Sequence, residues 1–545
     1  MRDQASVNTS QYDAAGRTIE TLSTTAAGSH KLQYQYDSLD RVTSRTLSGT
    51  GIPTPEVTSY QWDLAGRLLS HTTAIGGQNH TTSYQYDVAG RLAARKVQAG
   101  NQADLITQRY GYDQVERLAQ IKYIKAEGTG SEQLIEQLDY SYDAAGRRTS
   151  KTALNNNGLG ASETPMTASY DAANRMSQIS LNIAGATKTY ALSYDTNGNL
   201  TQKQNTATPA DKTNYTWDAS NRLSQIVQTG ATQANSLNAS FTYDAFGRRI
   251  QSSIATGNNP AQTVQYLYEG AQSLGEIRNG SLSHRLLTGL SLDETIARIA
   301  INSSGQKDSA ASRIYLTDAL NSVIAQLFDD NSNPGQLQNS YGYSPYGETI
   351  TVGPDATNNP VQYTSRENDG TGLYFYRNRY YDPALKRFVS RDPIGLAGGP
   401  NEHAYVEGNP LSYSDPEGLW ANIVGGAAIG AGMDIAIQLM VNGGKFQCIK
   451  WDVVLIAATA GAVNPFSSLN ALNSALKAER QWARAAGLRN GSRAAKRTSQ
   501  RGDKHNAGSW KEGASWAAVE GGAEGIGNLI PDEKHWRIGD ECECK

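Results

Sequence analysis

Two copies of one short motif, DPIGL at 392–396 and DPEGL at 415–419, place two aspartates where they could act as a pair. Asp392 and Asp415 are 23 residues apart. Two carboxyl groups that lie close together cannot both ionise cheaply, so one keeps its proton. The ionised carboxylate can then activate water while the protonated one polarises a carbonyl. The same letters also suit a type I turn, with Asp first, Pro second and Gly fourth, so a purely structural role is the alternative.

The elements that must position this pair begin with an internal repeat. Ten copies of a core resembling Tyr/Trp-Asp-x-x-x-Arg occupy residues 12–248. In the copy TTSYQYDVAGRLAAR (81–95), Asp87 starts a turn and Gly90 follows three residues later. Each unit is therefore predicted to be strand–turn–strand, and neighbouring units must stack into a continuous sheet. The repeated aspartates are Asp13, Asp37, Asp63, Asp87, Asp113, Asp143, Asp171, Asp195, Asp218 and Asp244.

The repeated Asp and Arg residues invite a catalytic interpretation, but ten similar copies argue against one. We interpret them as turn-forming aspartates and as arginines that pack over tyrosines.

The YDxxGR units resemble the YD repeats of RHS proteins and of insecticidal toxin complex C proteins. The stretches YLTDALNSV (315–323), YGYSPYGE (341–348) and TGLYFYRNRYYDPALKRFVSRDPIG (371–395) resemble the RHS core. The resemblance implies a mainly β fold: a YD-repeat sheet that spirals into a hollow shell, or cocoon, with a small, mainly α C-terminal toxin domain. The expected division is a YD-repeat shell at 1–265, an RHS core at 266–419 and a variable toxin domain at 420–545.

The same resemblance implies that Asp392 and Asp415 are the catalytic aspartates of a single-turnover, intramolecular aspartyl protease. The cut is then expected between Leu419 and Trp420. Arg379 matches an arginine that the family needs for cleavage, and a cation there could hold one carboxylate ionised or bind the developing oxyanion. The nearby Asp369 and Asp382 match no catalytic position and are interpreted as turn residues.

The composition changes at the expected cut, since no tyrosine follows Tyr413. Two apolar runs, 423–441 and 453–466, suit either a buried helical hairpin or a membrane-active segment. Residues 468–500 show helical spacing and lead into a basic stretch that suits nucleic acid, anionic lipid or a solvated face. The tail shows no zinc or other metal motif. Its polar candidates for a toxin site, each with a plain surface role as the alternative, are Lys504, His505, Glu512, His535 and Arg537.

Whole-chain composition sets further limits. A net charge of -3 gives no hint of a nucleic-acid or anionic-membrane partner for the molecule as a whole, and three cysteines exclude a disulfide-rich scaffold. Residues 1–30 have no apolar signal-peptide core. We therefore expect synthesis in the bacterial cytoplasm and delivery into target cells by a dedicated machine.

The leading hypothesis is a secreted polymorphic toxin whose shell encloses an effector and releases it by autoproteolysis. The effector is either a cytosolic enzyme, such as a nuclease, or a membrane-depolarising toxin. The resemblance implies a cognate immunity protein, a chaperone or a secretion apparatus such as the type VI system, and a target-cell membrane or nucleic acid; a monomer and no cofactor are expected. The alternative is a structural cell-surface or carbohydrate-binding YD-repeat protein without catalysis, which leaves the paired DPxGL motifs unexplained.

Overall fold

The computed structural model describes residues 6–25, 28–100, 106–155, 161–183, 185–230, 232–289, 291–329, 335–419 and 422–423. These residues belong to one compact unit, Met1–Gly425. Its regular structure is mainly β, as the sequence predicts. Every strand pair among the described residues is antiparallel, and so are the isolated bridges outside the named strands. The expected α toxin domain lies outside the described residues.

The first sheet contains the first six repeat units, with its strands in sequence order. Its strands are β1 (Ser6–Tyr12), β2 (Thr18–Thr25), β3 (Gly28–Tyr36), β4 (Val42–Gly49), β5 (Ile52–Trp62), β6 (Leu68–Ile75), β7 (Gln78–Tyr86), β8 (Leu92–Ala99), β9 (Ile106–Tyr112), β10 (Leu118–Lys125), β11 (Gln133–Tyr142) and β12 (Arg148–Ala153).

The second sheet also follows sequence order and continues past the last repeat core. Its strands are β13 (Met166–Tyr170), β14 (Met176–Ile183), β15 (Ala186–Tyr194), β16 (Leu200–Asn205), β17 (Lys212–Trp217), β18 (Leu223–Thr229), β19 (Leu237–Tyr243), β20 (Arg249–Thr256), β21 (Gln262–Glu269), β22 (Gln272–Arg278), β23 (Ser281–Thr288), β24 (Thr295–Ile301), β25 (Lys307–Thr317), β26 (Val323–Phe328), β27 (Leu337–Tyr343) and β28 (Thr349–Val352).

Short elements follow the second sheet. A small sheet contains β29 (Glu367–Asn368), β30 (Tyr374–Tyr376), β31 (Arg379–Asp382) and β32 (Arg387–Phe388), and β33 (Tyr413–Ser414) pairs with β34 (Asn422–Ile423). The helical turns are η1 (Gln233–Asn235), η2 (Ala356–Asn358), η3 (Tyr363–Ser365), η4 (Gly395–Gly398) and η5 (Val406–Gly408). Within the described part of the chain, none of these is long and apolar enough to cross a membrane.

Each repeat core forms the predicted turn, held by its own aspartate. In the unit of β7 and β8, Asp87 Oδ1 accepts hydrogen bonds from Ala89 N at 3.0 Å and Arg91 N at 2.9 Å. Asp87 Oδ2 lies 2.7 Å from Arg91 Nε, and Gly90 N donates to Asp87 O at 2.9 Å. Gly90 takes a φ of +80°, a conformation that favours glycine. One carboxylate therefore satisfies the turn backbone and orients the arginine.

The repeats are joined by arginines that stack on the aromatic ring of the next unit. The guanidinium of Arg67 lies 4.8 Å from the centroid of the Tyr86 ring, and Tyr86 Oη donates to Leu68 O at 2.9 Å. Such a stacked pair contributes about 0.5–1 kcal/mol. The repeated Asp and Arg are thus structural, as predicted. The same stacking occurs at Arg17/Tyr36, Arg41/Trp62, Arg91/Tyr112, Arg117/Tyr142, Arg175/Tyr194 and Arg222/Tyr243.

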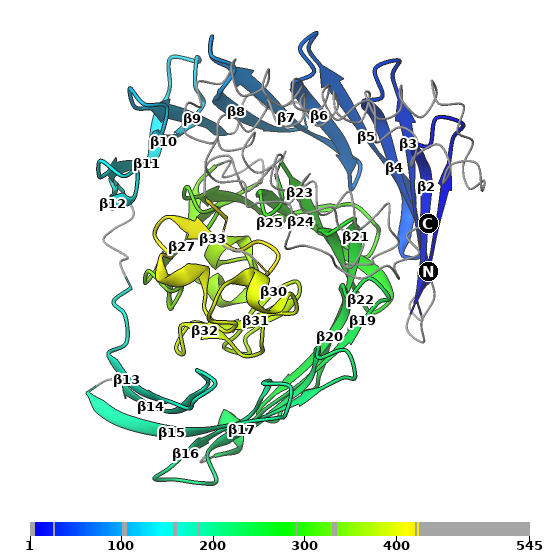
Figure 1. Ribbon diagram of the computed structural model, residues 1–545. Coiled ribbons are helices and arrows are strands. Elements are labelled where there is room, and N and C mark those ends of the chain that lie inside the picture. The colour runs from blue at the N-terminus through cyan, green and yellow to red at the C-terminus, as the bar shows by residue number, and fades with distance from the viewer. Residues whose placement is uncertain are drawn as a thin grey trace, which may run out of the picture. The chain divides into compact units, whose positions relative to one another are not determined.

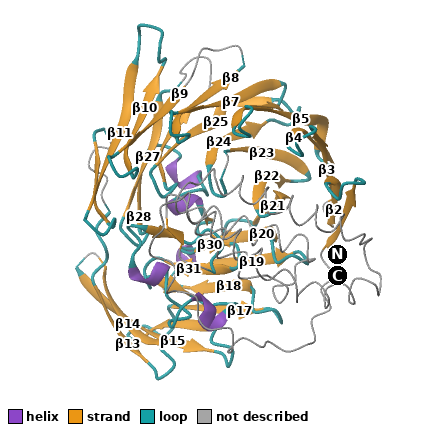
Figure 2. Cartoon of the chain, turned by 45° about the horizontal axis from the view of Figure 1, so that its top comes forward, coloured by secondary structure: helices purple, strands orange, loops and turns teal. Residues whose placement is uncertain are grey.

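The two large sheets share a core. Ile121 and Leu138 of the first sheet join Ile314 and Leu316 of the second in one buried apolar cluster. The small sheet lies on the concave side of the curved second sheet, where its yellow strands are enclosed by the green and teal ones (Figure 1; Figure 2 shows the same strands from above). The second sheet therefore forms the wall against which residues 367–388 pack. Tyr380 contacts Phe241 of this sheet, and Phe375, which contacts Tyr380, belongs to the same buried cluster.

Substituting the turn aspartates should show which repeat turns contribute most to the free energy of unfolding. Asp244 is completely buried and accepts from Phe246 N and Arg248 N at 2.9 Å each, so Asp244→Ala should cost about 1–3 kcal/mol of unfolding free energy. Asp143→Ala is the matched control, because its partner Arg147 is 69% exposed. Urea unfolding followed by tryptophan fluorescence should show a clearly lower midpoint for Asp244→Ala than for Asp143→Ala. Equal midpoints would contradict the larger contribution to stability assigned to the buried Asp244.

Candidate active site

The candidate site is built on the hairpin formed by β30 and β31. Its aromatic side chains Tyr374, Tyr376 and Tyr381 are buried with Phe388 and Tyr405 in one cluster. The Arg379 guanidinium stacks on the Phe388 ring, 3.7 Å from its centroid. Arg379 is only 3% exposed, so packing fixes its orientation.

The structure brings together the three residues that the sequence singled out. Arg379 Nη2 lies 2.9 Å from Asp392 Oδ2 and 3.4 Å from Asp415 Oδ2. Asp392 is 7% exposed and Asp415 2% exposed. Two carboxyl groups therefore converge on one guanidinium nitrogen in a poorly solvated place, where electrostatic interactions are strong.

Both aspartates also start the turns that the DPxG letters predict. Asp392 Oδ1 accepts from Ile394 N at 3.0 Å and its carbonyl accepts from Gly395 N at 3.0 Å. Asp415 O accepts from Gly418 N at 3.2 Å, and Asp415 Oδ1 accepts from Leu419 N at 2.9 Å. The turn and the paired site are thus compatible, because one carboxylate oxygen holds the turn while the other faces Arg379.

Leu419 is the residue before the expected cut, and it lies in this site. It is 2% exposed, and its backbone carbonyl and the Asp392 carboxyl both lie next to Gly398. Gly398 shows this proximity: a Cβ there would stand 2.5 Å from Asp392 Oδ2 and 3.0 Å from Leu419 O. Beyond the expected cut, the backbone of Asn422–Ile423 pairs with Tyr413–Ser414. Trp420 lies outside the described residues.

Burial controls the charge state of the site. It raises the pKa of Asp392 to about 6, although the positive charge of Arg379 acts in the opposite direction. Burial also lowers the pKa of Arg379, against the attraction of both aspartates. Asp392 can therefore hold a proton in mildly acidic solution, as a general acid must.

Sequence reasoning missed the groups that support Arg379 and Leu419. Glu402 O accepts from Arg379 Nη1 at 3.0 Å, and Gly418 O accepts from Arg379 Nε. A cleft lined by Gly398, Tyr405, Arg379, Asp415 and Leu419 reaches the site. No repeat or spacing in the sequence marks Glu402 or Gly398, because Glu402 acts through its backbone carbonyl and Gly398 through the absence of a side chain.

Two nearby aspartates and the tail complete the comparison with the sequence. Asp382 holds a turn, as predicted, by accepting from Ala384 N at 2.9 Å and Leu385 N at 3.1 Å. Asp369 lies in the connection between β29 and β30, and its carboxylate pairs with Arg249 and with Tyr266 Oη. The tail candidates lie outside the described residues: Lys504, His505, Glu512, His535 and Arg537.

Comparisons with known proteins agree with these features. A family model described as RHS Repeat matches residues 12–52 and 62–102. The tRNA3(Ser)-specific nuclease WapA of Bacillus spizizenii is 28% identical over 301 residues, 54% of this chain and 11% of the relative. Toxin subunit YenC1 of Yersinia entomophaga is 28% identical over 219 residues, 37% of this chain and 22% of the relative. The chain is an RHS-repeat protein. It is related to Tc toxin C subunits and to Rhs and WapA toxins.

A solved structure supports the fold of this RHS-repeat protein. TcdB2-TccC3 without its hypervariable C-terminal region matches with a TM-score of 0.56 and 20% identity, over 76% of this chain and 24% of that one. The chain thus spans less than a quarter of the length of each relative named here.

Replacing Arg379 should shift the titration of Asp392. In Arg379→Gln the pKa of Asp392 should rise clearly above 6, because the nearby cation that opposes the effect of burial is lost. Carboxyl ¹³C NMR of aspartate-labelled protein over pH 4–9 would measure it, with Arg147→Gln in an exposed repeat turn as the control. An unchanged or lower midpoint would show that Arg379 does not act on Asp392.

Proposed function

We propose that this RHS-repeat protein is a toxin shell that cuts its own chain between Leu419 and Trp420 and so frees a C-terminal effector. The observation that carries this proposal is that Asp392, Asp415 and Arg379 meet next to Leu419. Asp415 accepts from the Leu419 backbone N, and the Leu419 carbonyl and the Asp392 carboxyl both lie next to Gly398. The proposed division is a shell at 1–265, a core at 266–419 and an effector at 420–545. The antiparallel sheets and their likeness to TcdB2-TccC3 support a shell that encloses the effector.

The proposed reaction is hydrolysis of one peptide bond. Protonated Asp392, beside the Leu419 carbonyl, donates a hydrogen bond to that oxygen. Ionised Asp415, oriented by Arg379, takes a proton from water as the water oxygen attacks the carbonyl carbon. The tetrahedral intermediate collapses when the Leu419–Trp420 bond breaks and a proton passes to the Trp420 nitrogen. Because the substrate is the protein's own backbone, proximity supplies much of the acceleration.

The effector's chemistry is proposed in two forms. Relatives that are nucleases by name favour an enzyme that acts on nucleic acid, with the tail residues named above as its polar groups. The apolar runs at 423–441 and 453–466 favour a membrane-depolarising effector instead. Delivery into target cells, a cognate immunity protein and a type VI or other secretion apparatus belong to the same proposal. The TcdB2-TccC3 structures add another toxin subunit as a possible partner class.

Intact mass spectrometry tests the cut directly. The wild-type chain should give two fragments that meet between Leu419 and Trp420, whereas Asp392→Asn and Asp415→Asn should remain at the full 58.7 kDa. Each substitution removes the ionisable group while keeping nearly the same shape. Asp382→Asn is the matched control and should be cut, because Asp382 holds a turn in the same segment. An uncut, folded wild-type chain would contradict the proposal.

Cleavage should slow as the pH rises through about 6. Asp392 acts as the acid only when protonated, and its pKa is about 6, so each further pH unit should cost about tenfold in rate. Uncut chain recovered from inclusion bodies can be diluted from urea into buffers of pH 5–8, and the first-order rate followed by gel densitometry. A rate that climbs through pH 6–8 would reverse the role assigned to Asp392.

A further inference from the structure

Three consecutive residues of the hairpin hold three consecutive carbonyls of the turn before the cut. Arg377 Nη1 donates to Pro416 O. Asn378 donates to Glu417 O from its backbone N at 3.3 Å and from Nδ2 at 2.9 Å. Arg379 Nε donates to Gly418 O. The pairing advances by one residue along both segments, so the next backbone carbonyl in the series is that of Leu419.

The turn lies directly against the hairpin backbone. Gly418 takes a φ of +67°, and a Cβ there would stand 2.4 Å from Tyr376 O. A side chain at this position would push the turn away from the hairpin. The contact thus leaves little freedom for the turn to slide along Arg377–Arg379.

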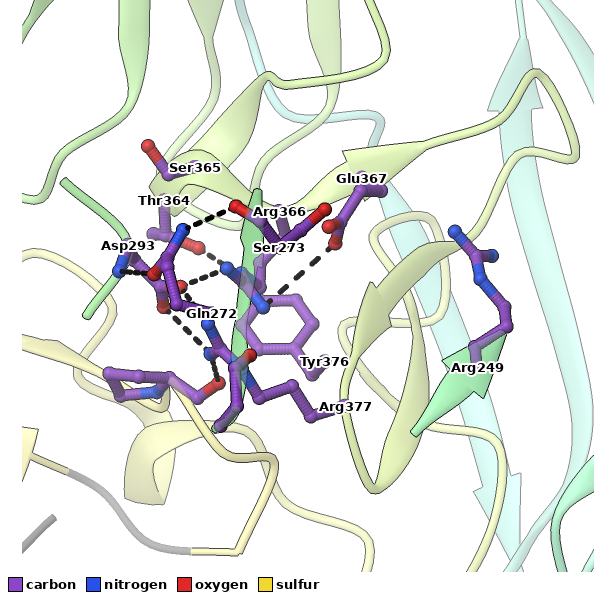
Figure 3. Close-up of polar contacts among 12 residues, drawn as sticks. Arg249, Gln272, Ser273, Asp293, Thr364, Ser365, Arg366, Glu367, Tyr376 and Arg377 are labelled. Carbon is purple, nitrogen blue, oxygen red and sulfur yellow. Dashed lines mark hydrogen bonds and ion pairs between the residues drawn. The ribbon is translucent and has the colours of Figure 1, made fainter. Parts of the chain in front are cut away.

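Arg377 is itself held by the second sheet. Asp293, in the connection between β23 and β24, lies with Oδ1 2.6 Å from Arg377 Nη2 and Oδ2 3.2 Å from Nη1. Arg377 Nε donates to Ala271 O at 3.0 Å. Arg366 also binds Asp293, which is 3% exposed, and Figure 3 shows the carboxylate among these arginines. A buried carboxylate that binds two arginines is held strongly, so Asp293 fixes the position of the Arg377 guanidinium.

The backbone at both ends of this contact uses a conformation that favours glycine. Arg377 takes a φ of 49° and Asp293 a φ of 68°. A charged residue in that region is unfavourable unless its surroundings enforce it, and such outliers cluster at functional sites. In both residues the charged side chain, which glycine could not supply, makes the ion pair between Asp293 and Arg377.

We propose that Asp293 and Arg377 form a register clamp that selects the Leu419–Trp420 bond for cleavage. Arg377 binds the substrate strand at Pro416, and Asp293 is a positioning residue that acts through Arg377. The clamp links the wall of the second sheet to the turn, so a correctly folded sheet aligns the carbonyl of Leu419 with Asp392. This inference rests on the proposed autocleavage and adds what determines its position.

Cleavage kinetics test the clamp. Pulse-labelled chains made by cell-free translation would be chased, and the cut rate and the fragment masses measured for Asp293→Asn, Arg377→Ala, Arg377→Lys and the double variant Asp293→Asn/Arg377→Ala. Misplacing a reacting group by about 1 Å can cost about 100-fold in rate. We expect Asp293→Asn and Arg377→Ala to be slower by about 10-fold or more, with some cuts at bonds beside Leu419–Trp420. Arg377→Lys, which keeps the charge, should recover part of the rate.

The double variant separates positioning from general destabilisation. If Asp293 acts through Arg377, the double variant should cut no more slowly than Arg377→Ala alone. Asp369→Asn is the matched control. Asp369 and Arg249 form another buried ion pair that joins the second sheet to residues 367–388. Figure 3 shows Arg249 apart from Asp293 and the arginines that bind it. This control should cut at the wild-type rate and position.

The outcomes distinguish this inference from the proposed function. An uncut wild-type chain would overturn both. A wild-type chain that is cut, beside Asp293→Asn and Arg377→Ala variants cut equally fast at the same bond, would overturn the clamp and leave autocleavage standing. Equal slowing by Asp369→Asn, or additive losses in the double variant, would also overturn it, because the effect would then come from general loosening of the core.

Discussion

The candidate site depends on one guanidinium group that faces two buried carboxyl groups. Arg379 lies within 3.4 Å of both Asp392 and Asp415, and it also donates to the backbone carbonyls of Glu402 and Gly418. Buried charges are costly unless they are paired and hydrogen bonded. The hairpin, both DPxGL turns and the aromatic cluster around Phe388 must therefore form together, because each supplies a partner that the others need.

The repeats provide the rigid support for this arrangement. Each Asp–Arg turn satisfies its own backbone, and most of the repeat arginines stack on an aromatic ring of the next unit, so the sheets grow by the same local contact repeated. The later strands of the second sheet depart from this pattern. They are more apolar on both faces, as in β24 and β26. The connection between β23 and β24 supplies the buried Asp293, and β20 of the last repeat supplies the buried Arg249; both charges anchor residues 367–388. The repeat strands are thus uniform, whereas the later part of the second sheet differs from them and contributes contacts to the hairpin.

An arginine and an aspartate in glycine-like backbone conformations show where local preference has been overridden. At Arg377 the sequence RNRY has no glycine, although a two-residue hairpin turn with a positive φ at its first position favours one. The Pro416 carbonyl and the Asp293 carboxylate explain why a long charged side chain stands there. Strain of this kind is expected where geometry matters more than stability.

The sequence alone determined the repeat and its turns, because those contacts lie within about four residues along the chain, as from Asp87 to Arg91, and strand alternation is periodic. It also identified Asp392, Asp415 and Arg379 through motifs and resemblance. Only the tertiary structure decided that these three meet at Leu419, that Gly398 leaves room for that carbonyl, that Asp369 pairs with Arg249, and that Asp293 holds Arg377. Those contacts join residues 13 to 120 positions apart, largely through backbone atoms and single side chains. Packing of separate strands creates them, and it leaves no periodic trace in the sequence.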